Sequence, residues 1–142
     1  MANKIFLDIN IVIDYVEERP NELDAIKEIM YLAQLQKIEL FISESVIATS
    51  IYVLKKQNID ALSVLREICK TVNVLPFSKD ILYYPVEKYK DTDDGLLYFL
   101  AYKSKMSYFI TRNVKDFTFL FPSLPVMSPT NFLKEIYFND IP

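Results

Sequence analysis

The sequence contains no histidine and a single cysteine, Cys69. Without histidine, sites in which a histidine activates a serine or cysteine nucleophile are excluded. One cysteine cannot form an internal disulfide, and with no histidine beside it an ordinary zinc site is excluded as well. Any catalysis must therefore use carboxylates, lysine, tyrosine or hydroxyl side chains, or a hard cation held by oxygen ligands.

Glycine is almost as rare, because Gly95 is the only one among 142 residues. This excludes the glycine-rich phosphate loops, both the P-loop and the dinucleotide fingerprint. The net charge of −3 is not that of a protein that holds nucleic acid mainly by charge. Apolar runs are short and broken by charge, and the first of them is too short for a secretory signal. We therefore expect a cytoplasmic protein with no membrane span.

The sequence does contain enough apolar residues, 51%, for a substantial core in one domain over residues 1–142. Short apolar strands alternate with segments of helical spacing. The predicted strands are 4–9, 38–43, 72–77, 107–111 and 125–128, and the predicted helices are 10–18, 21–37, 43–56, 60–70, 91–105 and 130–138. A further helix begins at Ser78 and is interrupted or ended by Pro85. This alternation predicts an α/β fold with a mostly parallel sheet of about five strands.

Acidic residues gather at one predicted edge of this sheet. Right-handed crossovers place the carboxyl ends of parallel strands together, and ligands bind beyond that edge. Asp8 ends the first strand, Asp116 follows the fourth, and Asp91 and Asp94 share one side of the helix 91–105. Several anions at one edge repel, and a divalent cation would offset that repulsion. Oxygen ligands suit Mg²⁺ or Mn²⁺, so the pattern predicts metal-dependent phosphodiester hydrolysis.

Plain structural roles remain open for the same residues. Asp91 serves equally well as a helix N-cap, and Asp93 is better explained as an outward-facing complement to the helix dipole. Asp116 can cap a turn, and Asn10 can cap a helix. A phospho-aspartate hydrolase with Asp8 as its nucleophile is a weaker alternative, because Asn10 stands where that class carries its second acid.

The motifs are similar to those of the PIN-domain ribonucleases. "IFLDINIVIDYV" resembles the opening motif of that family, and "KDTDDGLLYFLAYKSKMSYFITRNVKDF" resembles its acidic helix, strand and following turn. "PVMSPTNFL" resembles the closing strand and helix, and "FISESVIATSIYVLKK" matches one bacterial branch. The resemblance implies a three-layer α/β/α fold and cleavage of RNA with Mg²⁺ or Mn²⁺. Many members are VapC-like toxins, which implies an antitoxin partner and a homodimer.

The resemblance also implies a role for particular residues. By motif position the metal ligands would be Asp8, Asp94 and Asp116, and Asp91 would complete the catalytic carboxylates. Side chains around them, beside the metal or the substrate, would be Asn10, Thr49, Arg112 and Asn113.

The chain departs from the family pattern at three positions. Ile9 stands where the family usually has threonine or serine, and Gly95 where it usually has alanine. Thr49 stands where many family nucleases carry a glutamate in the third helix. Glu44, five residues earlier, is turned away on a helix and is not expected to replace it. A catalytically weakened PIN domain that binds RNA or a protein is therefore the alternative function.

Overall fold

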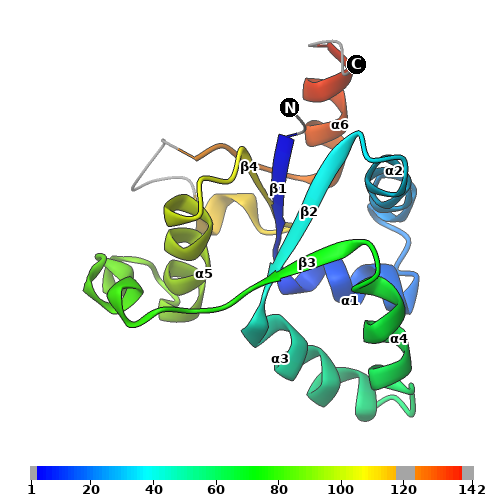
Figure 1. The fold of residues 1–142 in the computed structure, drawn as a ribbon, viewed down its shortest axis with the longest axis horizontal. Helices are drawn as coiled ribbons and strands as arrows, with labels where there is room; N and C mark the ends of the chain where they lie inside the picture. Colours follow the sequence, from blue (N-terminus) through cyan, green and yellow to red (C-terminus); the bar gives the residue numbers. More distant parts are fainter. Residues whose placement is uncertain (1–2, 118–123, 139–142) are drawn as a thin grey trace.

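A five-stranded sheet runs through the part of the chain that the computed structural model describes, residues 3–117 and 124–138 (Figure 1). Its strands are β1 (Asn3–Leu7), β2 (Ile38–Ser43), β3 (Val72–Leu75), β4 (Tyr108–Ile110) and β5 (Val126–Met127). They lie in the order β3-β2-β1-β4-β5, and each neighbouring pair is parallel. The predicted mostly parallel sheet is confirmed, and β1, which delivers Asp8, is its central strand.

Helices cover both faces of the sheet and give three layers (Figure 1). The helices are α1 (Ile9–Glu17), α2 (Leu23–Gln34), α3 (Glu44–Lys55), α4 (Ala61–Ile68), α5 (Thr92–Lys103) and α6 (Pro129–Phe138). Side chains alternate along β1, so that Ile5 and Leu7 join the core under α1, α2 and α6, while Phe6 joins the core under α5. Both faces are buried, as parallel sheets require. Within the described residues, no helix is both long and apolar enough to cross a membrane.

The segment between β3 and α5 differs from the predicted helix. It forms two 3₁₀ helices, η1 (Lys79–Tyr83) and η2 (Val86–Lys88), which are separated at Pro85. Proline has no N–H to donate and holds the preceding residue extended, and Tyr84 has φ −78° and ψ 158°. The interruption at Pro85 is confirmed, but the helix type is wrong, because the stretch left on each side suits short 3₁₀ turns.

The turn η2 packs closely against the start of α5, and this explains Gly95. A Cβ atom at Gly95 would lie 2.6 Å from the carbonyl oxygen of Val86 and 3.0 Å from its Cα. Both atoms belong to the backbone, so a side chain here would force η2 away from the helix. The departure from the family's usual alanine therefore has a packing cause.

Candidate active site

A cavity of about 450 Å³ lies at the carboxyl edge of the sheet, among the starts of α1, α3 and α5 and the turn after β4. Seven of the eight residues that the sequence singled out line it: Asp8, Asn10, Thr49, Asp91, Asp94, Arg112 and Asn113. The eighth, Asp116, instead lines an adjoining pocket, which Asp91 and Asp94 also line. Asp94 therefore stands between the two pockets and joins the carboxylates into one site.

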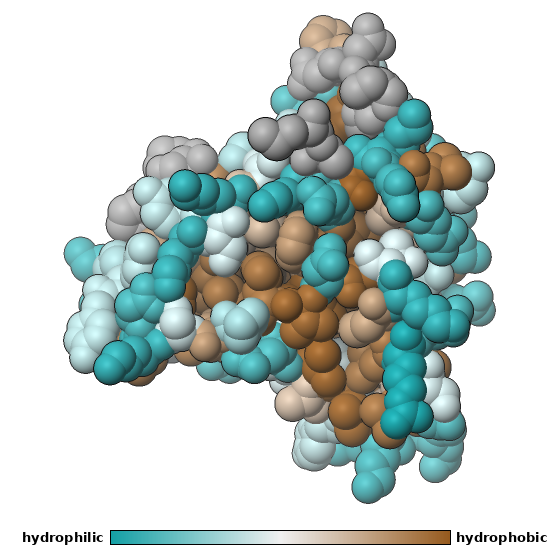
Figure 2. Space-filling model, in the orientation of Figure 1, coloured by the Kyte–Doolittle hydropathy of each residue, from teal (hydrophilic) through white to brown (hydrophobic). Residues whose placement is uncertain are grey.

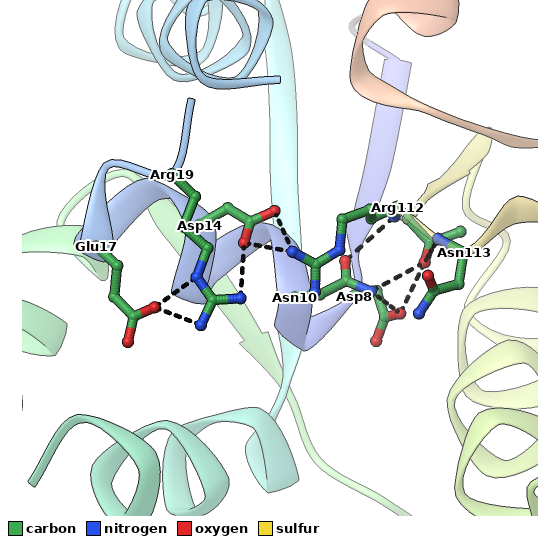
Figure 3. A network of polar contacts seen from close by, with 8 residues as sticks. Asp8, Asn10, Asp14, Glu17, Arg19, Arg112 and Asn113 are labelled. Carbon is green, nitrogen blue, oxygen red and sulfur yellow. Dashed lines mark hydrogen bonds and ion pairs between the residues drawn. The ribbon is translucent and has the colours of Figure 1, made fainter. Parts of the chain in front are cut away.

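Asp8 follows β1 directly and forms the N-cap of α1. Its side chain is buried and accepts hydrogen bonds from three donors, one of which is Asn10 (Figure 3). Oδ1 accepts from the backbone N of Ile9 at 2.7 Å, and Oδ2 accepts from Thr111 Oγ1 at 2.8 Å and Asn10 Nδ2 at 3.2 Å. Burial raises the pKa of Asp8, while the hydrogen bonds and the charge of Arg112 act in the opposite direction. The carboxylate is thus held in one orientation at the cavity wall.

Thr111 is a site residue that sequence reasoning missed. It follows β4 directly and is fully buried. Its Oγ1 donates to Asp8 and accepts from the backbone N of Asn113 at 3.1 Å. The backbone N of Asp8 also donates to Ile110 O at 2.9 Å. Thr111 therefore donates a hydroxyl to Asp8, whereas the side chain of Ile9 has none to donate. Its position at the same edge of the sheet as Asp8 is the feature of the sequence from which its role could have been predicted.

The start of α5 presents three acids in different environments. Asp91 is the N-cap, and its Oδ1 accepts from the backbone N of Asp93 at 3.0 Å, so the capping role is real. Asp93 is exposed, whereas Asp94 is partly buried. Burial is the largest effect that raises the pKa of Asp94 to about 7, followed by the charges of Asp8, Asp91, Asp116 and Asp93. Negative charge is therefore concentrated around Asp94.

Arg112 is tied to α1 at the rim of the cavity (Figure 3). Its backbone N donates to Asn10 Oδ1 at 3.2 Å, and its Nη1 lies 2.8 and 3.0 Å from the two carboxylate oxygens of Asp14. The side chain of Asp14 is only 4% exposed, and Arg19 Nη1 lies 3.6 Å from it. Asp14 is the second residue that sequence reasoning missed. It lies one helical turn after Asn10 on the same side of α1, which was its signal.

Residues 4–115 match the sequence model of a family described as "PIN domain". The chain belongs to the PIN-domain family. It is 29% identical over 139 residues to "Ribonuclease VapC1" of Aquifex aeolicus (strain VF5). This match covers 92% of this chain and 94% of that relative.

Two solved structures share the fold of this PIN domain. One is a chain of "Crystal structure of VapBC2 from Rickettsia felis bound to a DNA fragment from their promoter", with a TM-score of 0.66 and 19% identity over 87% of this chain and 96% of that one. The other is a chain of "Toxin-antitoxin complex from Klebsiella pneumoniae", with a TM-score of 0.65 and 25% identity over 88% and 97%. The three-layer fold that the motifs implied is thereby confirmed.

The α3 wall of this PIN-domain cavity carries no acid. Ser45, Val46 and Thr49 line it, so the position at which the resemblance implied a glutamate presents a hydroxyl. Glu44 does not replace that glutamate, because its Oε1 accepts a hydrogen bond from the backbone N of Phe77 at 2.8 Å and it does not line the cavity. The carboxylates come from β1, α5 and the turn after β4 alone.

The chemistry of the donors suits a hard cation. Within residues 3–117 and 124–138, no three acidic or other metal-binding side chains are grouped closely enough to form a metal site by themselves. Mg²⁺ does not need such a group, because it keeps several waters and commonly uses one or two carboxylates. Asp8 and Asp94 fit that requirement, and a cation there would offset the charges of the neighbouring aspartates, which together with burial raise the pKa of Asp94. The helices α1 and α5 also begin here, and the positive N-terminal ends of their dipoles favour the charged, carboxylate form of acids at this edge.

Proposed function

We propose that this PIN domain is a Mg²⁺- or Mn²⁺-dependent endoribonuclease and the toxin of a toxin–antitoxin pair. The observation that carries the proposal is one cavity in which Asp8, oriented by three donors, and Asp94, crowded by other carboxylates, come together. Family membership and the relative named as a ribonuclease support RNA as the substrate. Similarity to chains of toxin–antitoxin complexes supports a protein antitoxin as partner. The proposal includes a homodimer acting in the cytoplasm.

The roles of the residues follow from their positions. Asp8 and Asp94 would hold the cation, with Asp116 contributing from the adjoining pocket. When bound, the cation supplies an activated water and stabilises charge that develops on the phosphate. Asn10 and Thr111 keep the Asp8 carboxylate oriented, and this limits the reorganisation that binding requires.

Arg112 is the one positively charged side chain that lines this cavity within the described residues. The ion pair with Asp14 leaves the guanidinium of Arg112 at the rim of the cavity, with 35% of the side chain exposed. In our proposal, Arg112 and the amide of Asn113 contact phosphates of the RNA chain, which fixes the substrate relative to Asp8.

The proposal is tested by incubating single-stranded RNA and Mn²⁺ with wild type, Asp8→Asn and Asp94→Asn proteins. Asp24→Asn is the matched control, because Asp24 is an exposed acid in the first turn of α2, away from the cavity. Cleavage should be lost in the two cavity variants, retained in the control, and abolished in wild type by a chelator until Mn²⁺ is restored. Cleavage that survives unchanged in both cavity variants contradicts the proposal.

One observation favours a second function, a weakened PIN domain that binds RNA or a protein without cutting RNA. The wall of α3 offers Thr49 and Ser45 instead of a carboxylate, so the site has one acidic ligand fewer than many relatives. Calorimetric titration with Mn²⁺ separates the two functions. Binding at or below millimolar Mn²⁺ supports the nuclease, and no measurable binding in that range supports the binding module.

A further inference from the structure

The cavity has an apolar wall that the carboxylate chemistry does not use. Val46, Phe77 and Leu96 line the cavity together with Asn10 and Arg112. Figure 2 shows apolar surface gathering in the hollow between α5 and α3, with hydrophilic side chains around it. Phe77 packs against the core cluster under α5 yet remains partly exposed, so one part of its ring is supported and another is accessible.

Phe77 is fixed in this wall by a contact from another element. It lies in the loop between β3 and η1, and its backbone N donates to Glu44 Oε1 at 2.8 Å, 33 residues earlier in the chain. Glu44 is the first residue of α3, and the two residues after it, Ser45 and Val46, line the same cavity. The bond therefore clamps the loop to α3 and holds the ring beside the acidic site.

We propose that Phe77 is the platform on which an unpaired base of the RNA stacks, next to the phosphate at the acidic site. The proposal rests on the proposed ribonuclease function and names how the same site grips its substrate. A nucleotide has a charged phosphate and a flat, largely apolar base, and this cavity has a polar wall and an aromatic wall to match them. Single-stranded RNA presents such unpaired bases, whereas a duplex does not.

Electrostatic attraction alone would give this chain little affinity for RNA, so stacking would contribute much of the affinity. The net charge is −3, and the cavity carries Asp8, Asp91, Asp93 and Asp94 against Arg112. Phosphate contacts would supply affinity that falls steeply with salt. Stacking on an aromatic ring does not depend on charge and accepts any base. The structure therefore predicts RNA binding with a shallow salt dependence that is sensitive to the ring at Phe77.

The chain contains no tryptophan, so a Phe77→Trp variant carries a single indole and reports directly on stacking. The titration uses single-stranded RNA in an Asp8→Asn background, which prevents cleavage. We expect RNA to quench the indole fluorescence, and an oligonucleotide that is abasic at every position to leave it unquenched. Phe138→Trp is the matched control, because Phe138 is 89% exposed on α6 and does not line the cavity. Binding without quenching, or equal quenching in the control, overturns the proposal.

The second measurement is the steady-state kinetics of variants at Phe77. Loss of the aromatic ring is distinguished from loss of folding by measuring the thermal unfolding of each variant. Phe77→Ala and Phe77→Leu should raise KM by between about 5-fold and about 100-fold, with a smaller change in kcat, because stacking contributes in that range per base. Phe77→Tyr should retain the wild-type KM, and Phe138→Ala should change nothing. Thermal unfolding of each variant verifies that it is folded. An unchanged KM in folded Phe77→Leu overturns the proposal.

Glu44 enters as a positioning residue. Glu44→Ala removes the acceptor for the backbone N of Phe77, and we expect its KM to rise as in Phe77→Ala, whereas Glu44→Gln keeps an acceptor oxygen and should restore wild-type KM. If wild type neither binds nor cleaves RNA, the proposed ribonuclease function fails first. If wild type cleaves RNA and the Phe77 variants match it, only the stacking role fails.

Discussion

Replacing Gly95 by alanine tests how closely η2 packs against α5. The added Cβ would lie 2.6 Å from Val86 O, 3.0 Å from Val86 Cα and 3.2 Å from Tyr89 Cδ1, whereas ordinary van der Waals contact is 3.4–4 Å. The first two atoms are backbone and cannot move by a rotamer change. The turn η2 must therefore shift away from the start of α5, where Asp94 is the preceding residue.

Two opposing terms decide the sign of the change in stability. Alanine is favoured over glycine inside a helix by about 1 kcal/mol. Overpacking typically costs about 1–3 kcal/mol, and a clash with backbone belongs in the upper part of that range. We therefore expect Gly95→Ala to lower the free energy of unfolding by about 1–2 kcal/mol. The melting temperature should fall by roughly 3–8 °C in a chain of this length.

Urea unfolding measures this change, and a second variant calibrates the helix term. Ala48 is exposed within α3, so Ala48→Gly should cost about 1 kcal/mol through helix propensity alone. If Gly95→Ala stabilises the protein by the amount that Ala48→Gly destabilises it, the close approach of η2 does not exist and the reasoning is refuted.

Three further predictions concern charge. Asp94 must lose its proton to bind a cation, and its pKa is raised to about 7, so Mn²⁺ affinity should increase about fivefold from pH 6 to pH 7 and level off above pH 8. Calorimetry at several pH values measures this affinity. The same pH profile in an Asp94→Asn variant would contradict the assignment to Asp94. The folded-state pKa of Asp94 lies above its ordinary value, so the contribution of Asp94 to stability is present at low pH and is lost as the pH rises through about 7. The metal-free protein should therefore have a lower urea midpoint at pH 8 than at pH 5. Adding Mn²⁺ should restore the midpoint at pH 8. Arg112→Ala removes the nearest cation from buried Asp14 and should cost about 1–3 kcal/mol in urea unfolding. Adding Asp14→Asn should recover part of that cost, and strictly additive losses would show that the pair is not coupled.

The sheet and its acidic edge could be predicted because their signals are local. Alternating strands and helices fix the class of fold, and the rule that parallel strands end at one edge brings Asp8 together with Asp94. The three-residue spacing of Asp91 and Asp94 was enough to place them on one side of α5. In the same way, Pro85 in the sequence is enough to predict the interruption between η1 and η2.

The partners of these residues could not be predicted, because they depend on pairing across the chain. Thr111 reaches Asp8 because β1 and β4 align Leu7 with Ile110, and a shift of that alignment would move the hydroxyl away. Arg112 meets Asp14 across 98 residues for the same reason. No local pattern distinguishes Phe77 from the other aromatic residues, since its packing under α5 and its bond to Glu44 place it in the cavity.

The distance along the chain between Asp8 and the hydroxyl that orients it has a consequence for protein synthesis. Thr111 lies 103 residues after Asp8, and Arg112 lies 102 residues after Asn10. Contacts so far apart in sequence form only after the intervening chain has been made and β4 has paired with β1. A growing polypeptide that still lacks β4 has Asp8 and its local donors Ile9 and Asn10, but not the hydroxyl of Thr111. A PIN domain with this connectivity therefore completes its acidic site only after most of its own length has left the ribosome.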